Sequence, residues 1–365
     1  MITEPIGFIG AGRMGLPVCA RLVASGYEVL VADRNPERAG HVQAAGAVWV
    51  GDTPAVASRA GVLMTMLPGS PELREAMRLA TPSLRPRTTW IDLTSASPLL
   101  GSELVALARE RQVECLEAPV GGGIAEAGAG RLELFVGASP AAVQRQRGLL
   151  EALGTVNHVG DNGAGYTTKL LVNLLWFGQA VAIAEALLVG RRAGLDLDVL
   201  RAALRRSAAA SALIDRDLDA LLKGDYMASF GLHRCCEELE AVRALAAELD
   251  VPFEHSALVA QTYSEALIRY GPVDGELLAV SLLEERAGLR CATAASAEGK
   301  IAARRYVEEL LHTHPPEEFN GQESGRPAAD VASHGDAQEG RAGRFAVSGQ
   351  GGERQAAEGD HPHGR

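Results

Sequence analysis

Two polar residues, Lys169 and Asn173, interrupt an apolar stretch that the sequence predicts as one long helix over residues 163–194. Residues four apart lie on the same face of a helix, so both side chains point to the same place. A lysine in a partly dry cleft loses stability in its charged form and can exchange a proton more readily. An asparagine offers a donor and an acceptor without net charge. We therefore predict that Lys169 is a general acid/base and that Asn173 orients a substrate.

A glycine-rich motif near the N-terminus predicts a second ligand. Residues 5–9 read as a buried strand and residues 16–25 as an amphipathic helix, with G-x-G-x-x-G between them. The first glycine permits a tight turn, the second lets the backbone approach a pyrophosphate, and the third lets helix and strand pack closely. An acidic residue, Asp33, follows the next strand at the distance from the glycine motif at which an acid binds the ribose hydroxyls of a dinucleotide. The predicted dinucleotide-binding residues here are Gly10, Ala11, Gly12, Arg13, Met14, Gly15 and Asp33.

The choice between NAD and NADP depends on Asp33 and Arg34. Asp33 would accept hydrogen bonds from the ribose hydroxyls, which favours NAD. Arg34 could pair with a 2′-phosphate or lie on the adenine, or it could be a solvated loop charge. We therefore predict NAD or NADP as the cofactor, with NAD preferred.

Strand-like and helix-like segments alternate through the first half of the chain. The helices between them begin with a capping residue followed by proline, as at Asn35, Ser70, Ser97 and Ser139. This alternation predicts an α/β fold with a doubly wound, largely parallel Rossmann sheet, whose ligands lie past the carboxyl ends of the strands. The further strand-like segments are 28–32, 62–66, 89–93, 114–118, 133–136 and 155–159. The loops expected at that edge contain Met66, Leu67, Pro68, Thr94 and Ser95.

The second half of the chain has helical periodicity only. Apolar residues recur at spacings of three and four over 197–206, 210–223, 233–248 and 254–270. We predict a Rossmann domain over residues 1–162 and an all-helical substrate and dimerisation domain over 163–306, joined by the long interdomain helix. Residues 307–365 contain few large apolar side chains, and we predict a disordered tail there.

The amino-acid composition limits the classes of partner that the protein is expected to bind. The formal net charge is -11, and no Lys/Arg-dense block stands out, which argues against nucleic acid and anionic membranes. The long apolar helix is interrupted by polar residues, so we do not expect a membrane span. The five cysteines are scattered without metal-ligand spacing, so we expect no metal site and a reducing cytoplasmic compartment.

Five motifs in order resemble the β-hydroxyacid dehydrogenase family, which includes 3-hydroxyisobutyrate dehydrogenase and, more distantly, 6-phosphogluconate dehydrogenase. The resemblance runs from about residue 5 to residue 285. The N-terminal motif FIGAGRMG starts at Phe8, and the cofactor loops are TMLP from Thr65 and IDLTS from Ile91. The substrate loop is APVGGG from Ala118, and the catalytic motif is GAG from Gly163 with Lys169 and Asn173.

The resemblance also implies substrate-binding residues. Gly121, Gly122 and Gly123 correspond to a loop that binds a carboxylate, and their backbone N–H groups form a candidate anion nest. The family usually has serine at the first of these positions and Lys-Asp where this chain has Glu237-Glu238. Phe230 falls where the family has phenylalanine, and Glu237 would repel a carboxylate or attract an ammonium.

The sequence therefore predicts an NAD(P)-dependent oxidoreductase that interconverts a β-hydroxyacid, similar to 3-hydroxyisobutyrate, and its carbonyl. The resemblance implies a homodimer or homotetramer that acts on a small molecule. An imine reductase shares the expected architecture but generally lacks the lysine. A non-catalytic dinucleotide-binding protein is the alternative from another class.

Overall fold

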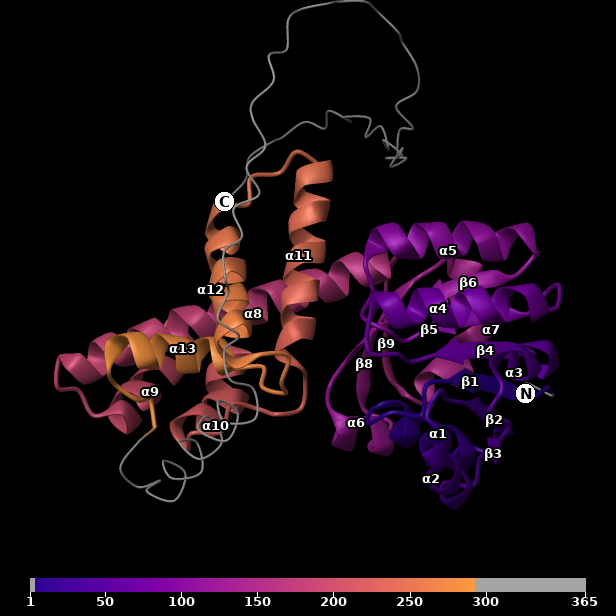
Figure 1. The fold of residues 1–365 in the computed structure, drawn as a ribbon, viewed down its shortest axis with the longest axis horizontal. Coiled ribbons are helices and arrows are strands. Elements are labelled where there is room, and N and C mark those ends of the chain that lie inside the picture. The colour runs from indigo at the N-terminus through magenta and orange to yellow at the C-terminus, as the bar shows by residue number, and fades with distance from the viewer. Residues whose placement is uncertain (1–3, 293–365) are drawn as a thin grey trace, which may run out of the picture. The chain divides into compact units, whose positions relative to one another are not determined.

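The computed structural model describes residues 4–292 of the chain (Figure 1). The predicted tail, 307–365, and the last part of the predicted helical domain, 293–306, lie outside the described residues. The strands are β1 (Ile6–Ile9), β2 (Val29–Ala32), β3 (Val48–Trp49), β4 (Val62–Thr65), β5 (Thr89–Asp92), β6 (Glu114–Glu117), β7 (Val120–Gly121), β8 (Leu132–Gly137) and β9 (Gly154–Gly160).

These nine strands form one sheet in the order β3-β2-β1-β4-β5-β6-β8-β7, with β9 pairing with β8. The strands from β3 to β6 in this order are parallel. Strands β1, β2, β4 and β5 are buried at every residue, as expected for a sheet that helices cover on both faces. The carboxyl ends of β1, β4 and β5 therefore meet at one edge, where the predicted cofactor loops begin.

The sheet differs from the expected parallel pattern at β8. This strand pairs antiparallel with both β6 and β7 and parallel with β9. The connection from β7 to β8 contains only the short helix α6 (Ile124–Ala129), and a parallel crossover needs a dozen or more residues. The short connection therefore reverses the chain direction.

The predicted capping residue occupies the N-cap of its helix at three of the four positions. Asn35 and Ser139 accept hydrogen bonds from backbone N–H groups of their helices, and Ser97 occupies the N-cap of its helix. Ser70 instead lies inside its helix, and its hydroxyl accepts the N–H of Ser97 at 2.9 Å. The remaining helices here are α1 (Gly15–Ala24), η1 (Pro36–Arg38), α2 (Ala39–Ala44), α3 (Thr53–Arg59), α4 (Ser70–Ala80), η2 (Thr81–Ser83), α5 (Pro98–Glu110) and α7 (Pro140–Glu151).

The long predicted helix is α8 (Ala164–Arg192), 29 residues that span about 44 Å at the α-helical rise. It contacts β8, β9 and α5, and it also contacts the later helices α11 (Leu232–Glu248), α12 (Glu254–Tyr270) and α13 (Leu278–Ala287). Among the described helices, α8 alone has the length and composition of a membrane span, a test that core helices of soluble proteins also pass. Its contacts on both sides make it the element that joins the sheet to the helical core.

The helical region has its own core, built from α8 and the helices that follow it. Helix α9 (Leu197–Arg205) and helix α12 agree with the predicted segments. The segment predicted as a helix over 210–223 is helical from 212 to 222, but it begins with a π-helical turn at Leu213–Asp217 before the short α10 (Leu218–Leu222). The hydroxyl of Ser211 accepts the N–H of Ile214, three residues later, which is the hydrogen bond of a helix N-cap and explains why the helical segment begins after Ser211.

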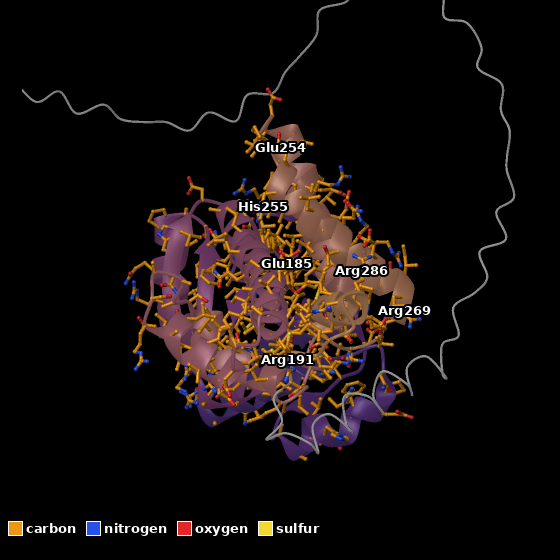
Figure 2. All side chains as sticks on the ribbon, turned by 90° about the vertical axis from the view of Figure 1, so that its left-hand side faces the viewer. Glu185, Arg191, Glu254, His255, Arg269 and Arg286 are labelled. Atoms are coloured by element: carbon orange, nitrogen blue, oxygen red, sulfur yellow. The ribbon has the colours of Figure 1, made fainter. Side chains whose placement is uncertain are left out.

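Surface ion pairs connect α12 and α13. Figure 2 shows Arg269 and Arg286 at the surface of this region. Arg269 pairs with Glu285 at 3.0 Å, and Arg286 pairs with Glu265. Exposed pairs of this kind stabilise a fold little, so apolar burial holds these helices together.

Candidate active site

The glycines of the loop over residues 10–15 are required for two different reasons, the fold itself and the approach of a ligand. Gly10 has a φ of +102°, and a Cβ there would lie 2.3 Å from the carbonyl oxygen of Met66. A Cβ at Gly15 would lie 1.8 Å from the carbonyl oxygen of Gly10. A Cβ at Gly12 would meet no protein atom within 4 Å. The fold therefore requires Gly10 and Gly15, whereas the open space at Gly12 is where the backbone can approach a dinucleotide pyrophosphate.

Asp33 holds the glycine loop from the end of β2. Its carboxylate accepts the N–H of Ala11 at 2.7 Å and the N–H of Asn35 at 2.8 Å. Arg34 is exposed beside it. A carboxylate at the end of the second strand is the group that binds the ribose hydroxyls in dinucleotide-binding folds of this type.

Arg13 leaves the glycine loop and contacts the helical region. Its guanidinium donates to Asp274 at 2.7 Å and to the carbonyl oxygens of Ala228 and Ser229. Met14, the next residue, precedes α1 and packs against the core of the sheet. The loop that the sequence assigns to the dinucleotide thus also touches the segment that precedes α11.

The two predicted cofactor loops are hydrogen-bonded to each other. The hydroxyl of Thr94 accepts the backbone N–H of Leu67 at 3.1 Å. Thr94 and Met66 are buried, whereas Pro68 is exposed and Ser95 is half-buried. The structure therefore brings the ends of β4 and β5 together, as the parallel sheet predicts.

Lys169 and Asn173 lie on one face of α8 and contact each other, as their spacing predicts. The Lys169 ammonium donates to Asn173 Oδ1 at 3.0 Å, and Asn173 Nδ2 donates to Glu238 Oε2 at 2.5 Å. The hydroxyl of Ser95 also donates to Glu238. Because a carboxylate only accepts hydrogen bonds, Glu238 fixes the Asn173 amide with its oxygen toward Lys169.

The buried position of Lys169 favours proton exchange. Burial lowers the pKa of Lys169 below its ordinary value, while the nearby charges of Glu238 and Glu276 act in the opposite direction. Burial also raises the pKa of Glu238 and of Glu276. A lysine with a lowered pKa has an accessible neutral form, which is what a general base requires.

One N–H group of the predicted anion nest is already occupied. Gly122 has a φ of +107°, and the N–H of Gly123 donates to Glu126 Oε2 at 3.0 Å. Gly121 pairs with Glu133 as part of β7. A substrate carboxylate at this loop would therefore meet the carboxylate of Glu126.

Glu237 and Phe230 lie outside the Lys169 contacts. Phe230 packs against the helical core, and Glu237 is exposed. Arg234 pairs with Glu237 at 2.8 Å and with Glu72 at 2.7 Å, close to the backbone of Gly69. The charge reversal at Glu237 is thus matched by a neighbouring arginine that contacts the β4–α4 loop.

Sequence reasoning missed the role of Glu238, the neighbour of Glu237. Glu238 is 7% exposed and shares the buried face of α11 with Leu232, Cys235 and Leu239. An acid on the apolar stripe of a helix needs a polar partner, because an unpaired buried charge is costly. The position of this acid on the apolar face of a predicted helix is therefore the sequence signal that could have identified Glu238.

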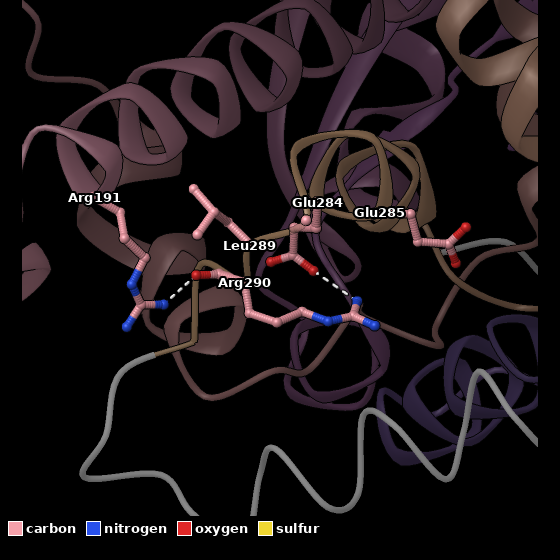
Figure 3. A pocket seen from close by; sticks show the side chains of 6 residues that line it. Arg191, Glu284, Glu285, Leu289 and Arg290 are labelled. Atoms are coloured by element: carbon pink, nitrogen blue, oxygen red, sulfur yellow. Dashed lines mark hydrogen bonds and ion pairs between the residues drawn. The ribbon is translucent and has the colours of Figure 1, made fainter.

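A pocket at the other end of α8 contains none of the predicted site residues. It is lined by Arg191, Leu289, Arg290, Glu284, Glu285 and Gly288 (Figure 3). Arg191 donates to the carbonyl oxygen of Arg290, and Arg290 pairs with Glu284 at 3.0 Å. Lys169 precedes Arg191 by about 33 Å along the helix axis, so this pocket is separate from the candidate active site.

Two family models cover most of the described chain. Residues 5–161 match the NAD binding domain of 6-phosphogluconate dehydrogenase, and residues 163–283 match the NAD-binding domain of NADP-dependent 3-hydroxyisobutyrate dehydrogenase. The candidate cofactor residues and the Lys169–Asn173 pair fall within these matches.

Named relatives and solved structures agree with these matches. The chain is 28% identical to a 2-(hydroxymethyl)glutarate dehydrogenase from Eubacterium barkeri over 71% of this chain and 87% of that protein. It is 34% identical to an NAD-dependent L-serine dehydrogenase from Pseudomonas aeruginosa over 56% of this chain and 70% of that protein. A structure of Mycobacterium tuberculosis 3-hydroxyisobutyrate dehydrogenase with L-serine has a TM-score of 0.71 at 26% identity, covering 77% and 99% of the two chains.

Imine reductases share the fold at a greater distance. The enzyme from Myxococcus stipitatus has a TM-score of 0.54 at 20% identity, covering 77% of this chain and 99% of that one, which shows a common fold alone. The dehydrogenases are nearer in sequence and in structure, and their family models cover both the glycine loop and the Lys169 helix. This chain therefore belongs to the β-hydroxyacid dehydrogenase family of NAD(P)-binding oxidoreductases that act on CH–OH groups.

Proposed function

We propose that the protein interconverts a small β-hydroxy compound and its carbonyl, with Lys169 as the general acid/base. The contact of Lys169 with the Asn173–Glu238 pair carries this proposal, because it places a lysine of lowered pKa beside a fixed amide. In this proposal residues 1–162 bind the dinucleotide, and residues 163–306 form the substrate side.

Each residue has a separate task in the reaction. The dinucleotide, when bound, supplies the acceptor or donor of the hydride. Neutral Lys169 takes the hydroxyl proton during oxidation, and the ammonium returns it during reduction. Asn173, held by Glu238, keeps the substrate oxygen in register with Lys169.

Plain 3-hydroxyisobutyrate is not the substrate that the charges favour most. Glu238 and Glu276 lie near Lys169, and Glu126 occupies part of the glycine nest. These acids disfavour a bare carboxylate and complement an ammonium. A substrate that carries an amino group, as in the substrate named for the L-serine dehydrogenase relative, is therefore the candidate that these charges favour.

The test is a panel of substrates assayed with NAD and NADP in parallel. The panel contains 3-hydroxyisobutyrate, 2-(hydroxymethyl)glutarate, L-serine and a cyclic imine with the reduced cofactor. We expect turnover of a hydroxy compound, with L-serine exceeding 3-hydroxyisobutyrate. Turnover of the imine alone would support the imine reductase alternative. Dinucleotide binding without any turnover would support a non-catalytic protein.

We propose that NAD is preferred over NADP because of Asp33. Replacing Asp33 with serine should lower kcat/KM for NAD by about 10–100-fold, as expected for loss of hydrogen bonds to a charged group. The ratio of NADP to NAD activity should rise, since Arg34 remains beside the site. Steady-state kinetics with both cofactors measure this ratio. Glu37→Gln, a neighbouring exposed acid, is the control and should leave the ratio unchanged.

We further propose self-association through the exposed apolar side chains of α8. Leu175 is 65% exposed and Val189 is 69% exposed, and Leu171 and Val172 are exposed as well. Leu175→Arg should shift the mass measured by light scattering toward the monomer. Leu107→Arg, an equally apolar exposed position on α5, should leave the mass unchanged. A monomeric wild-type protein would contradict the proposal.

A further inference from the structure

We propose that Glu117 is a positioning residue for Lys169, because its carboxylate fastens the first turn of α8 to the sheet. The inference rests on the proposed role of Lys169 and concerns how the fold holds this lysine in place. Glu117 ends β6 and is only 1% exposed.

The Glu117 carboxylate caps the N-terminus of α8. Its Oε1 accepts the N–H of Gly163 at 2.6 Å, and its Oε2 accepts the N–H of Tyr166 at 3.4 Å. The N–H of Gly165 also bonds to this carboxylate. The first N–H groups of a helix have no partner within it, and the helix dipole favours a negative charge there. Glu117 therefore satisfies the start of α8 from another element.

Two neighbouring glycines leave the space that the Glu117 side chain occupies. A Cβ at Gly137 would lie 2.8 Å from Glu117 Oε2, and a Cβ at Gly165 would lie 3.0 Å from Glu117 Cβ. Asn162, which precedes the helix, donates to the carbonyl oxygens of Cys115 and Gly137 at 3.1 and 3.2 Å. Two side chains, Glu117 and Asn162, thus tie this turn to β6 and β8.

A second branch connects this turn to the cofactor loops. The hydroxyl of Tyr166 donates to Asp92 Oδ2 at 2.7 Å. Asp92 also accepts the hydroxyls of Thr65 at 2.5 Å and Thr94 at 2.7 Å. Thr94 in turn accepts the N–H of Leu67. A buried chain of hydrogen bonds therefore runs from the cofactor loops to the first turn of α8.

Lys169 follows Tyr166 by three residues, so about 4.5 Å of helix separates it from the fastened turn. A helix moves as a rigid rod over such a distance, and a shift of this turn shifts the lysine. A misplacement of about 1 Å can cost roughly 100-fold in rate. Glu117 and Tyr166 touch neither substrate nor cofactor in this proposal, and they act through the position of α8.

We expect the charge on Glu117 to change near neutral pH. Burial raises the pKa of Glu117 to about 7 and the pKa of Asp92 to about 6. The titratable groups that face Glu117 are Asp92 from β5, Tyr166 from α8 and Cys115 from β6. The ionised carboxylate is the form that accepts the N–H groups of α8 best. We therefore expect kcat to fall as Glu117 is protonated below about pH 7.

The test compares Glu117→Gln, Glu117→Asp and Tyr166→Phe with the wild-type full-length protein. Glu117→Gln should lower kcat by about 10–100-fold, with little change in dinucleotide Kd, and should remove the fall in kcat near pH 7. Glu117→Asp should restore part of the rate, and Tyr166→Phe should show a smaller loss. Glu114→Gln, a partly exposed acid on the same strand, is the matched control and should behave as wild type.

Amide hydrogen exchange of residues 163–170 separates this inference from the proposed function. Faster exchange of this segment in Glu117→Gln, with the remaining protein unchanged, supports the fastening even if no substrate is turned over. Wild-type exchange together with wild-type kcat and pH profile in Glu117→Gln would overturn the inference.

Discussion

Replacing Lys169 with alanine should lower kcat/KM for alcohol oxidation by about 1,000-fold, as expected for loss of a general base. Dinucleotide Kd should stay near the wild-type value, because the glycine loop lies on a different part of the chain. Steady-state kinetics and a binding titration followed by nicotinamide fluorescence measure the two quantities. Lys223→Ala, at an exposed position in the helical region, is the matched control.

The pH dependence of the wild-type enzyme supplies a second readout for Lys169. Burial lowers the pKa of this lysine, and oxidation requires its neutral form. Oxidation should therefore accelerate as pH rises toward the lowered pKa, and reduction should slow over the same range. Because the pKa lies below the ordinary lysine value of 10.5, the change falls at a lower pH than for a free lysine. Unaltered pH profiles in Lys169→Ala would remove this residue from proton transfer.

Gly12→Ala should abolish tight dinucleotide binding without harming the fold. The new Cβ meets no protein atom within 4 Å, so the melting temperature should match the wild type. A dinucleotide needs close approach of the backbone at this position, and we expect Kd to rise about 100-fold, or about 2.7 kcal/mol. Isothermal titration calorimetry and thermal unfolding measure the two quantities.

Gly15→Ala is the informative contrast to Gly12→Ala. Its Cβ would lie 1.8 Å from the carbonyl oxygen of Gly10, so the loop must move or α1 must shift. This variant should lose both thermal stability and dinucleotide affinity. If Gly12→Ala keeps wild-type affinity, the dinucleotide does not approach the loop at this glycine.

Periodic and capped segments were predictable because their signals are local. The helix over 254–270 follows directly from apolar spacing, and α8 lies within two residues of its predicted ends. The antiparallel direction of β8 and the π-helical turn before α10 were not predictable from the sequence, because both depend on how a short connection fits its surroundings.

The residues of the candidate site were likewise predictable only where their signal in the sequence is local. The contact between Lys169 and Asn173 follows from helical spacing alone. Glu238 has a sequence signal, because it lies on the apolar face of its helix, but the partners of Glu238 and Glu117 could not be predicted, because the groups that each acid contacts are distant in sequence. The sequence contains these acids, and only the tertiary structure shows which backbone and amide groups they serve.

The contacts of Arg13 lead us to expect that the affinities for dinucleotide and for substrate depend on each other. Its guanidinium belongs to the glycine loop but bonds to Asp274 and to the carbonyl oxygens of Ala228 and Ser229. Ser229 donates in turn to Glu276, one of the acids near Lys169. Thermodynamic linkage is reciprocal, so a dinucleotide that weakens the Arg13 contacts changes substrate affinity by the same factor that substrate changes dinucleotide affinity. The Kd of one ligand, measured without and at saturation of the other, gives the coupling free energy, and we expect this coupling to be smaller in Arg13→Gln than in the wild type.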